Sequence, residues 1–287
     1  MGTVITVTSG KGGTGKTTLT AAFIRFSGAA AIADCDVDAP NLHLVARQEG
    51  RPERAAFIGS DKARIEPLRC TGCGLCASLC RFGAIARENG VWAVNEYACE
   101  GCGVCARVCP AGAALMEKDE AGERLLYRNG RVFSTAALKM GRGTSGKLVA
   151  EVKKALYGAA PEAALAIIDG SPGIGCPVIA SVSGVDLVLI VAEPSVSGLS
   201  DLARLLETVA GFHTRAAVCL NKWDTNPEKS AELERFCRER AVPFLGKIPY
   251  DRNASAAVNQ GMSLADIDCP ARDALRALYE ETMKILN

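Results

Sequence analysis

The 287-residue chain has few aromatic residues and almost no net charge. Phe, Trp and Tyr make up 5% of it, and 33 basic residues against 32 acidic ones leave a net charge of +1. This balance disfavours a dedicated nucleic-acid-binding protein, which usually carries a basic excess. No apolar run reaches the roughly 18–20 residues that span a bilayer, and no signal peptide precedes the first apolar segment. We therefore expect a cytoplasmic protein with neither nucleic acid nor membrane as a partner.

Histidine is scarce and cysteine is abundant, so we expect any metal site among the cysteines to have cysteine ligands and no histidine. The two histidines, His43 and His213, lie outside the region where cysteines gather. Eight of the 13 cysteines form two runs with identical C-x₂-C-x₂-C-x₃-C spacing. The first run is Cys70, Cys73, Cys76 and Cys80, and the second is Cys99, Cys102, Cys105 and Cys109. In a cytoplasmic chain, closely spaced cysteines indicate metal binding rather than disulfides.

This spacing is that of the bacterial two-cluster ferredoxins, in which the fourth cysteine of each run ligates the other run's cluster. The resemblance implies two 4Fe–4S clusters. The first would bind Cys70, Cys73, Cys76 and Cys109, and the second Cys99, Cys102, Cys105 and Cys80. The alternative is structural zinc, which usually takes two well-separated C-x₂-C pairs or Cys₂His₂. Arg81 departs from the ferredoxin pattern, because a proline usually follows the fourth cysteine, as Pro110 does here.

A glycine-rich loop near the start of the chain predicts a nucleotide site. It follows a short β-branched segment and fits G-x₄-G-K-[ST], the P-loop, whose backbone N–H groups surround phosphate oxygens. Its residues are Gly10, Lys11, Gly12, Gly13, Thr14, Gly15, Lys16, Thr17 and Thr18. In this motif Lys16 reaches the β and γ phosphates and Thr17 binds Mg²⁺.

Lys11 is a second lysine early in this loop. The string K-G-G-x-G-K-T-T resembles the deviant Walker A motif of the MinD/Mrp/ParA ATPases and of the nitrogenase iron protein. The resemblance implies that Lys11 contacts the nucleotide of a partner subunit, so that dimerisation and ATP hydrolysis are linked. That partner would be a second copy of the chain or a paralogous subunit.

Further acidic residues carry the same resemblance. Asp34 and Asp169 each end an apolar strand, where doubly wound sheets bind ligands. The position of Asp36 matches the family's water-positioning aspartate, and Asp169 matches the Walker B acid. The resemblance implies Mg²⁺ binding, directly or through water, by Thr17, Asp34 and Asp169. It implies catalytic roles for Lys11, Lys16, Asp36 and Asp169.

The base pocket is also implied by the resemblance. Asn221 matches the family's adenine-contacting asparagine, and the other expected pocket residues are Lys222, Pro249, Tyr250 and Asp251. The string N-K-W-D, which ends at Asp224, could also indicate guanine, since GTPases read that base through the aspartate of N-K-x-D. The deviant Walker A motif favours ATP.

Apolar strands alternate with helical segments over most of the chain, which predicts an α/β fold with a doubly wound, mostly parallel sheet. Expected strands are 3–8, 30–34, 164–169, 186–192, 216–221 and 242–248, and expected helices are 15–26, 145–157, 196–210, 228–238, 253–259 and 271–285. The alternation stops where the cysteines lie. We therefore predict a P-loop ATPase domain of residues 1–60 and 117–287 and an inserted, small α+β ferredoxin-like domain of residues 61–116. A hairpin over 123–133, turning at Asn129-Gly130, would lead back to the ATPase.

Taken together, the chain resembles a MinD/Mrp-superfamily ATPase with an inserted two-cluster ferredoxin. We expect ATP-dependent dimerisation coupled to electron transfer toward a redox or iron–sulfur acceptor protein. Two alternatives stay open: a cluster carrier or scaffold of the Mrp type, and a regulatory ATPase that senses redox state. Cys176, which follows the strand ending at Asp169, could also share a cluster across a dimer. The two copies of Cys176 in a dimer would supply only two of the four ligands that such a cluster needs.

Overall fold

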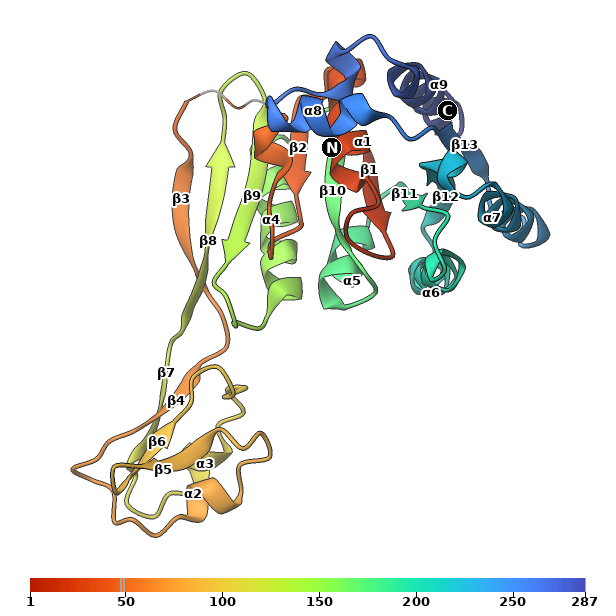
Figure 1. Ribbon diagram of the computed structural model, residues 1–287. Helices are drawn as coiled ribbons and strands as arrows, with labels where there is room; N and C mark the ends of the chain where they lie inside the picture. Colours follow the sequence, from red (N-terminus) through yellow and green to blue (C-terminus); the bar gives the residue numbers. More distant parts are fainter. Residues whose placement is uncertain (47, 49, 287) are drawn as a thin grey trace. The chain divides into compact units, whose positions relative to one another are not determined.

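Short, buried strands connected by helices build most of the structure, as the sequence pattern predicts. The computed structural model describes residues 1–46, 48 and 50–286 (Figure 1). It divides into two units. Unit 1 comprises Met1–Arg54, Arg124–Ala137 and Ser145–Asn287, and unit 2 comprises Ala55–Glu123 and Leu138–Thr144. Among the described residues, no helix is both long and apolar enough to cross a bilayer.

The large sheet contains nine strands in the order β13-β12-β11-β1-β10-β2-β9-β8-β3. The strands are β1 (Thr3–Ser9), β2 (Ala31–Asp34), β3 (Glu53–Ile58), β8 (Glu120–Tyr127), β9 (Val132–Leu138), β10 (Leu165–Pro172), β11 (Leu187–Ala192), β12 (Arg215–Asn221) and β13 (Phe244–Ile248). Neighbours from β13 to β9 pair in parallel. From β1 the chain goes to β2 on one side, while β11 lies on the other. This switch in direction places the carboxyl end of β1 where doubly wound sheets bind ligands.

Helices cover both faces of this sheet. They are α1 (Lys16–Ser27), α4 (Ser145–Ala159), α5 (Cys176–Val182), α6 (Gly198–Ala210), α7 (Pro227–Glu239), α8 (Arg252–Asn259) and α9 (Pro270–Lys284). Ile5 and Val7 of β1 point into one core with α1 and α9, whereas Thr6 donates to the carbonyl of Ser181 in α5 on the opposite face. Helices α4, α5 and α6 pack in succession on that second face (Figure 1). Burial on both faces is why the parallel strands are almost continuously apolar.

Besides parts of β3, β8 and β9, unit 2 contains two short helices and two antiparallel pairs of strands. Strand β4 (Lys62–Ile65) pairs with β7 (Ala114–Glu117), and β5 (Ile85–Glu88) pairs with β6 (Val91–Val94). The helices are α2 (Leu75–Ser78) and α3 (Val104–Val108), and each begins after a glycine in the left-handed region. The small core contains Cys76, Cys99 and Cys105, with cysteines of both runs packed around it. Cysteine side chains therefore take the place of much of an ordinary apolar core.

The predicted α/β fold with a mostly parallel sheet is confirmed, and several element boundaries differ. The hairpin after the cysteines is longer than residues 123–133: its two strands are β8 and β9, which run in opposite directions and join the large sheet (Figure 1). Strand β3, which the pattern did not predict, forms the end of that sheet. The helix predicted from Val196 begins only at Gly198, because a turn closed by the Gly198 N–H on the Ser195 carbonyl precedes it.

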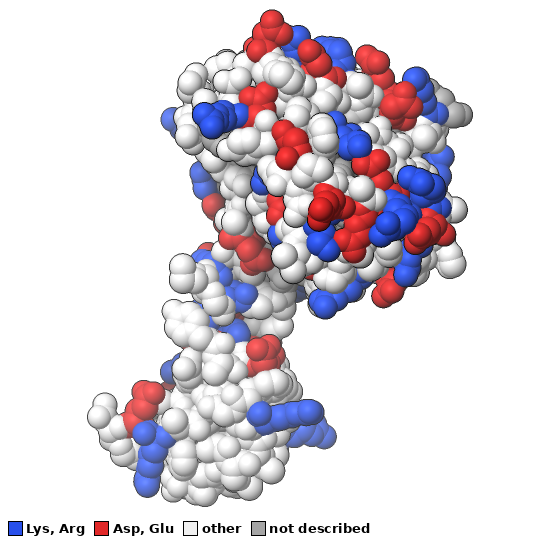
Figure 2. Space-filling model, turned by 45° about the vertical axis from the view of Figure 1, so that its right-hand side comes forward, with Lys and Arg blue, Asp and Glu red and all other residues white. Residues whose placement is uncertain are grey.

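Charged side chains are mixed over the surface. Figure 2 shows acidic and basic residues interspersed over the face of unit 1 that is in view. That face carries no field of a single sign, as the near-neutral composition predicts.

Candidate nucleotide site and cysteine cavity

The glycine-rich loop lies between β1 and α1, at the carboxyl edge of the large sheet. Gly13 and Gly15 have φ values of 80° and 94°, which side chains with a Cβ rarely adopt. At Gly15 a Cβ would also lie 2.2 Å from Nδ2 of Asn221. The first N–H groups of α1 have no partner inside the helix, so the helix favours an anion at this end. Loop and helix together form a binding site for phosphate groups.

Asn221, the last residue of β12, and Lys222, which follows it, hold the loop by two of its carbonyl oxygens. Asn221 Nδ2 donates to the Thr14 carbonyl at 2.7 Å, and Lys222 Nζ donates to the Gly13 carbonyl at 2.9 Å. These two carbonyls are engaged by protein donors, and the backbone N–H groups of the loop are the donors that a bound anion can accept from. The predicted base-contacting residues therefore lie beside the phosphate loop.

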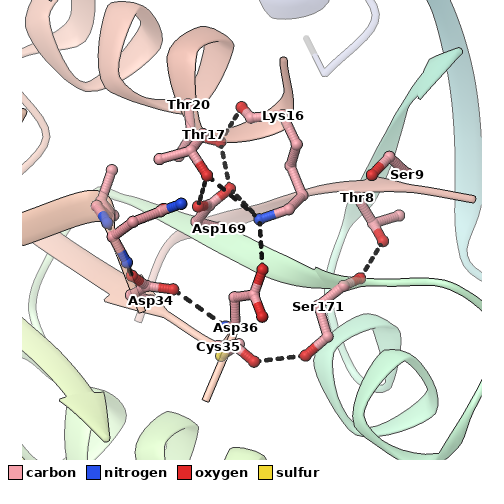
Figure 3. A network of polar contacts seen from close by, with 12 residues as sticks. Thr8, Ser9, Lys16, Thr17, Thr20, Asp34, Cys35, Asp36, Asp169 and Ser171 are labelled. Carbon is pink, nitrogen blue, oxygen red and sulfur yellow. Dashed lines mark hydrogen bonds and ion pairs between the residues drawn. The ribbon is translucent and has the colours of Figure 1, made fainter. Parts of the chain in front are cut away.

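A buried ion pair occupies the centre of the site. Asp169, in the second half of β10, accepts hydrogen bonds from Thr17 Oγ1 at 2.7 Å and Thr20 Oγ1 at 2.9 Å (Figure 3). Lys16 Nζ lies 3.0 Å from Asp169 Oδ1 and 3.7 Å from Asp36 Oδ2. The Asp169 side chain is fully buried and that of Lys16 is 6% exposed. Parallel strands thus bring the P-loop lysine and threonine together with acids that lie far from them in the sequence.

Asp34 is held mainly by backbone groups. Its carboxylate accepts the N–H groups of Asp36 at 3.0 Å and of Asn41 and Leu42 at 2.9 Å. Burial and the neighbouring Asp169 carboxylate together raise the pKa of Asp34 to about 7, against the lowering effect of the backbone N–H groups and Lys16. Asp34 therefore orders the segment after β2, and its carboxylate adds negative potential next to the Lys16 ammonium.

Burial and the neighbouring charges also shift the pKa values of Lys16 and Asp36. Burial alone would lower the pKa of Lys16, but the carboxylates of Asp169, Asp36 and Asp34 outweigh it and raise that pKa. Burial raises the pKa of Asp36, although Lys16 opposes the shift. Lys16 is therefore a firmly charged ammonium in a group of acids, which suits it to receive phosphate oxygens.

Beside the loop is a cavity of about 340 Å³ that reaches under α8 and α9. All five residues predicted for the base pocket line it, namely Asn221, Lys222, Pro249, Tyr250 and Asp251. Apolar side chains complete its wall, namely Leu19 of α1, Val258 of α8, Leu264 of the 3₁₀ helix Leu264–Asp266, and Ala271 and Leu275 of α9. Sequence reasoning missed these residues, because their apolar spacing on a helix signals core packing and nothing more.

Asp224, the acid of the N-K-x-D string, has a different structural role. Its carboxylate accepts the N–H of Tyr250 at 2.7 Å and so connects the loop after β12 to the loop after β13. Asp224 is not among the residues that line the cavity in the described part of the chain.

Lys11 lies apart from the ion pair of Lys16. Its Nζ is 2.6 Å from Glu193 Oε1 and donates to Ser195 Oγ at 2.9 Å. Lys222 Nζ is 3.3 Å from the other oxygen of Glu193. Burial alone would raise the pKa of Glu193, but the hydrogen bond from Lys11 and the charge of Lys222 lower it below its usual value. Sequence reasoning did not find Glu193, which belongs to no motif.

The cysteine runs meet around a second cavity, within unit 2. It is lined by Cys70, Cys73 and Cys76 of the first run and by Cys109 of the second, with Trp92 and several small residues. Backbone N–H groups point at sulfur: Ala84 to Cys80 at 3.4 Å, Ala63 to Cys99 at 3.4 Å and Ala113 to Cys109 at 3.2 Å. Such N–H groups favour a thiolate, and those near Cys109 lower its pKa.

No group of three or more His, Cys, Asp or Glu side chains in the described residues is arranged to hold a metal ion. Iron–sulfur ligation by the eight cysteines therefore stays a prediction. Cys176 is exposed and begins α5.

Comparisons with known proteins agree with the nucleotide site. The family model "CobQ/CobB/MinD/ParA nucleotide binding domain" matches residues 5–264. "Uncharacterized protein MJ0578" of Methanocaldococcus jannaschii is 32% identical over 98% of this chain and 97% of its own length. "Uncharacterized ATP-binding protein MJ0547" of the same organism is 24% identical over 100% of this chain and 88% of its own.

Solved structures show the same fold. The cell division ATPase MinD of Pyrococcus furiosus has a TM-score of 0.58 and 19% identity, with 99% of this chain and 100% of that chain covered. MinD of Pyrococcus horikoshii, solved with Mg-ADP, has a TM-score of 0.58 and 18% identity, with 99% and 97% covered.

Proposed function

Because the chain belongs to the CobQ/CobB/MinD/ParA nucleotide-binding family and is a P-loop ATPase, we propose that it couples ATP binding to electron transfer through two 4Fe–4S clusters. The observation that carries the proposal is the cavity in unit 2. Three cysteines of one run and the last cysteine of the other line it, which is the set that cross-run ligation requires. Such clusters, when bound, accept and donate single electrons.

ATP is the proposed nucleotide. The carboxylate of Asp224, which would read guanine in a GTPase, is engaged by the N–H of Tyr250. A relative is named for ATP binding, and a structural neighbour was solved with Mg-ADP. Thr17 Oγ1 and Asp169 Oδ2 lie 2.7 Å apart, and these two side chains would bind Mg²⁺ directly or through water. Lys16 and the loop N–H groups would bind the phosphates, and Asp36 would position the attacking water.

The active form is proposed to be a dimer, of two copies or of this chain with a paralogous subunit. The deviant Walker A lysine, Lys11, supports this. Lys11 would act on the nucleotide of the partner subunit. The electron acceptor would be a redox or iron–sulfur protein.

Iron analysis of paired cysteine variants tests the clusters. After anaerobic reconstitution the chain should hold about eight irons, as two 4Fe–4S clusters require. With cross-run ligation, C70S/C109S should lose about half of the iron and C70S/C80S nearly all of it. Ligation within each run reverses these two results. C176S serves as the control that keeps all of the iron, and stoichiometric zinc in place of iron would refute the cluster assignment.

An EPR-monitored redox titration, with and without a non-hydrolysable MgATP analogue, tests the coupling. A shift of about 60 mV or more corresponds to a tenfold change for one electron and would support ATP-gated electron transfer. With no shift, the coupling proposal fails. Transfer of iron to an apo-acceptor would then indicate a carrier, and an ATPase rate that changes with cluster oxidation would indicate a sensor.

A further inference from the structure

The cysteine-containing part of unit 2 repeats itself at an offset of 29 residues, the separation of Cys70 and Cys99 in the sequence. At this same offset β4 corresponds to β6 and β5 to β7, and the pairs β4–β7 and β5–β6 are both antiparallel. The first cysteine set is Cys70, Cys73, Cys76 and Cys109, and the second is Cys99, Cys102, Cys105 and Cys80. Each residue beside one set therefore has a counterpart beside the other, and the two environments can be compared.

Lys62 is a charged residue without a charged counterpart. Its Nζ donates a hydrogen bond to the carbonyl oxygen of Cys99, and the next residue, Ala63, donates its backbone N–H to Cys99 Sγ at 3.4 Å. The counterpart of Lys62 is Val91, whose side chain carries no charge and no donor. An ammonium group is therefore held on the backbone of the second set, and the corresponding position of the first set has none.

The other charges around the second set are more strongly screened. Charged residues also adjoin Lys62 and the cysteines of this set in the sequence, namely Asp61, Arg81 and Glu100, and all three are exposed. Lys62 is partly buried and holds a defined hydrogen bond. Water and salt screen exposed charges more than partly buried ones. We therefore expect Lys62 to make the largest single contribution to the electrostatic potential at Cys99.

The first set has an aromatic ring where the second has a methyl group. Trp92 lines the cavity of the first set, and its Nε1 donates to the Gly72 carbonyl at 3.3 Å. The counterpart of Trp92 is Ala63. The indole leaves less room for water, and an apolar environment disfavours the added negative charge of a reduced cluster. Trp92 and Lys62 therefore make reduction harder at the first set and easier at the second.

We propose that Lys62 is a positioning residue that raises the reduction potential of the cluster held by the second set, so that an electron delivered to unit 2 comes to rest there. It acts through Cys99, because net charge and hydrogen bonds around the ligating cysteines set the potential of a cluster. One electron moves from the first cluster, which is oxidised, to the second, which is reduced. No bond forms or breaks, and a one-electron reductant supplies the electron. This role rests on the proposed function, because it requires two 4Fe–4S clusters.

An EPR-monitored redox titration of the anaerobically reconstituted full chain tests this role. K62M should lower one of the two potentials by about 60 mV or more, which corresponds to a tenfold change for one electron. K62R retains the charge and should keep both potentials close to those of the wild type. K118M is the matched control, because Lys118 is an exposed lysine of the same unit. Unchanged potentials in K62M overturn the proposal.

V91K tests the same idea in the opposite direction. It introduces a lysine at the position that corresponds to Lys62, where Val91 is 45% exposed, and it should raise the potential of the first cluster. If K62M loads less iron than the wild type, V91K decides, and unchanged potentials in V91K then refute the proposal.

Single-cluster variants identify the cluster that responds. C70S/C109S retains the second set, and C80S/C99S retains the first. K62M should lower the potential in the C70S/C109S background and leave it unchanged in the C80S/C99S background, and the reverse result contradicts the assignment. Iron content separates this proposal from the proposed function. A wild type that loads no iron refutes both, whereas about eight irons with identical titrations of K62M and wild type refute only the role of Lys62.

Discussion

Substitution of Asp169 by asparagine should destabilise the nucleotide-free protein by about 3 kcal/mol. The change leaves Lys16, whose side chain is 6% exposed, without its fully buried partner. Removing one member of a buried ion pair costs about 3–5 kcal/mol, since the remaining charge stays desolvated. We expect the lower end of this range, because Asp36 Oδ2 still lies 3.7 Å from the Lys16 ammonium. Asparagine has nearly the shape of aspartate, so the loss reports the charge and not a cavity.

Asp36→Asn is the matched control. It removes the same charge from the same lysine, but at 3.7 Å and from a side chain that is 16% exposed. Partly solvated pairs contribute about 0–1 kcal/mol, so D36N should change the free energy of unfolding by no more than that. The buried pair and the partly exposed pair are thereby compared at one site.

The assay is urea unfolding followed by tryptophan fluorescence. The chain has two tryptophans, Trp92 in unit 2 and Trp223 in unit 1. A W92F background therefore leaves one reporter, and it lies in the unit that contains the ion pair. Equal stabilities of D169N and the W92F parent would refute the reasoning. So would a loss in D36N as large as that in D169N.

Four further predictions concern other side chains and a glycine of unit 1. K153M should destabilise the protein by about 2–4 kcal/mol in urea unfolding. The buried Lys153 ammonium donates to three carbonyl oxygens around the end of α5, and methionine cannot donate to them. A neutral or stabilising effect would contradict this. Burial lowers the pKa of Lys153 from 10.5 to about 8, so the folded protein binds fewer protons than the unfolded one between these values, and the wild type should gain stability over K153M as pH rises through this window. G15A should abolish binding of a fluorescent ATP analogue, since its Cβ would lie 2.2 Å from Asn221, and binding within threefold of the wild type would argue against the site. N226A removes the side chain that caps α7 and should cost about 1 kcal/mol in urea unfolding, with N226D as the variant that retains the cap.

The phosphate loop and the alternating strands could be predicted because both depend on local sequence. The P-loop motif is eight consecutive residues, and its glycines and lysine need only the preceding strand and the following helix to be placed. Burial on both faces makes parallel strands apolar throughout, which the pattern records. Strand β3 escaped prediction because an exposed terminal strand carries no such pattern: five of its six residues, Glu53–Ile58, are exposed.

What the sequence alone determined is the kind of chemistry: a triphosphate loop with two lysines, acids at strand ends and two four-cysteine runs. The strand order decided the rest. It placed β11, β1 and β12 near one another, and so brought Glu193 to Lys11 and Lys222 across separations that no motif spans. It also engaged Asp224 with the Tyr250 N–H and drew apolar side chains from α1, α8 and α9 around one cavity. These contacts are non-local, and the residues that make them follow ordinary patterns for a core helix or a surface ion pair, so only the folded chain reveals their role.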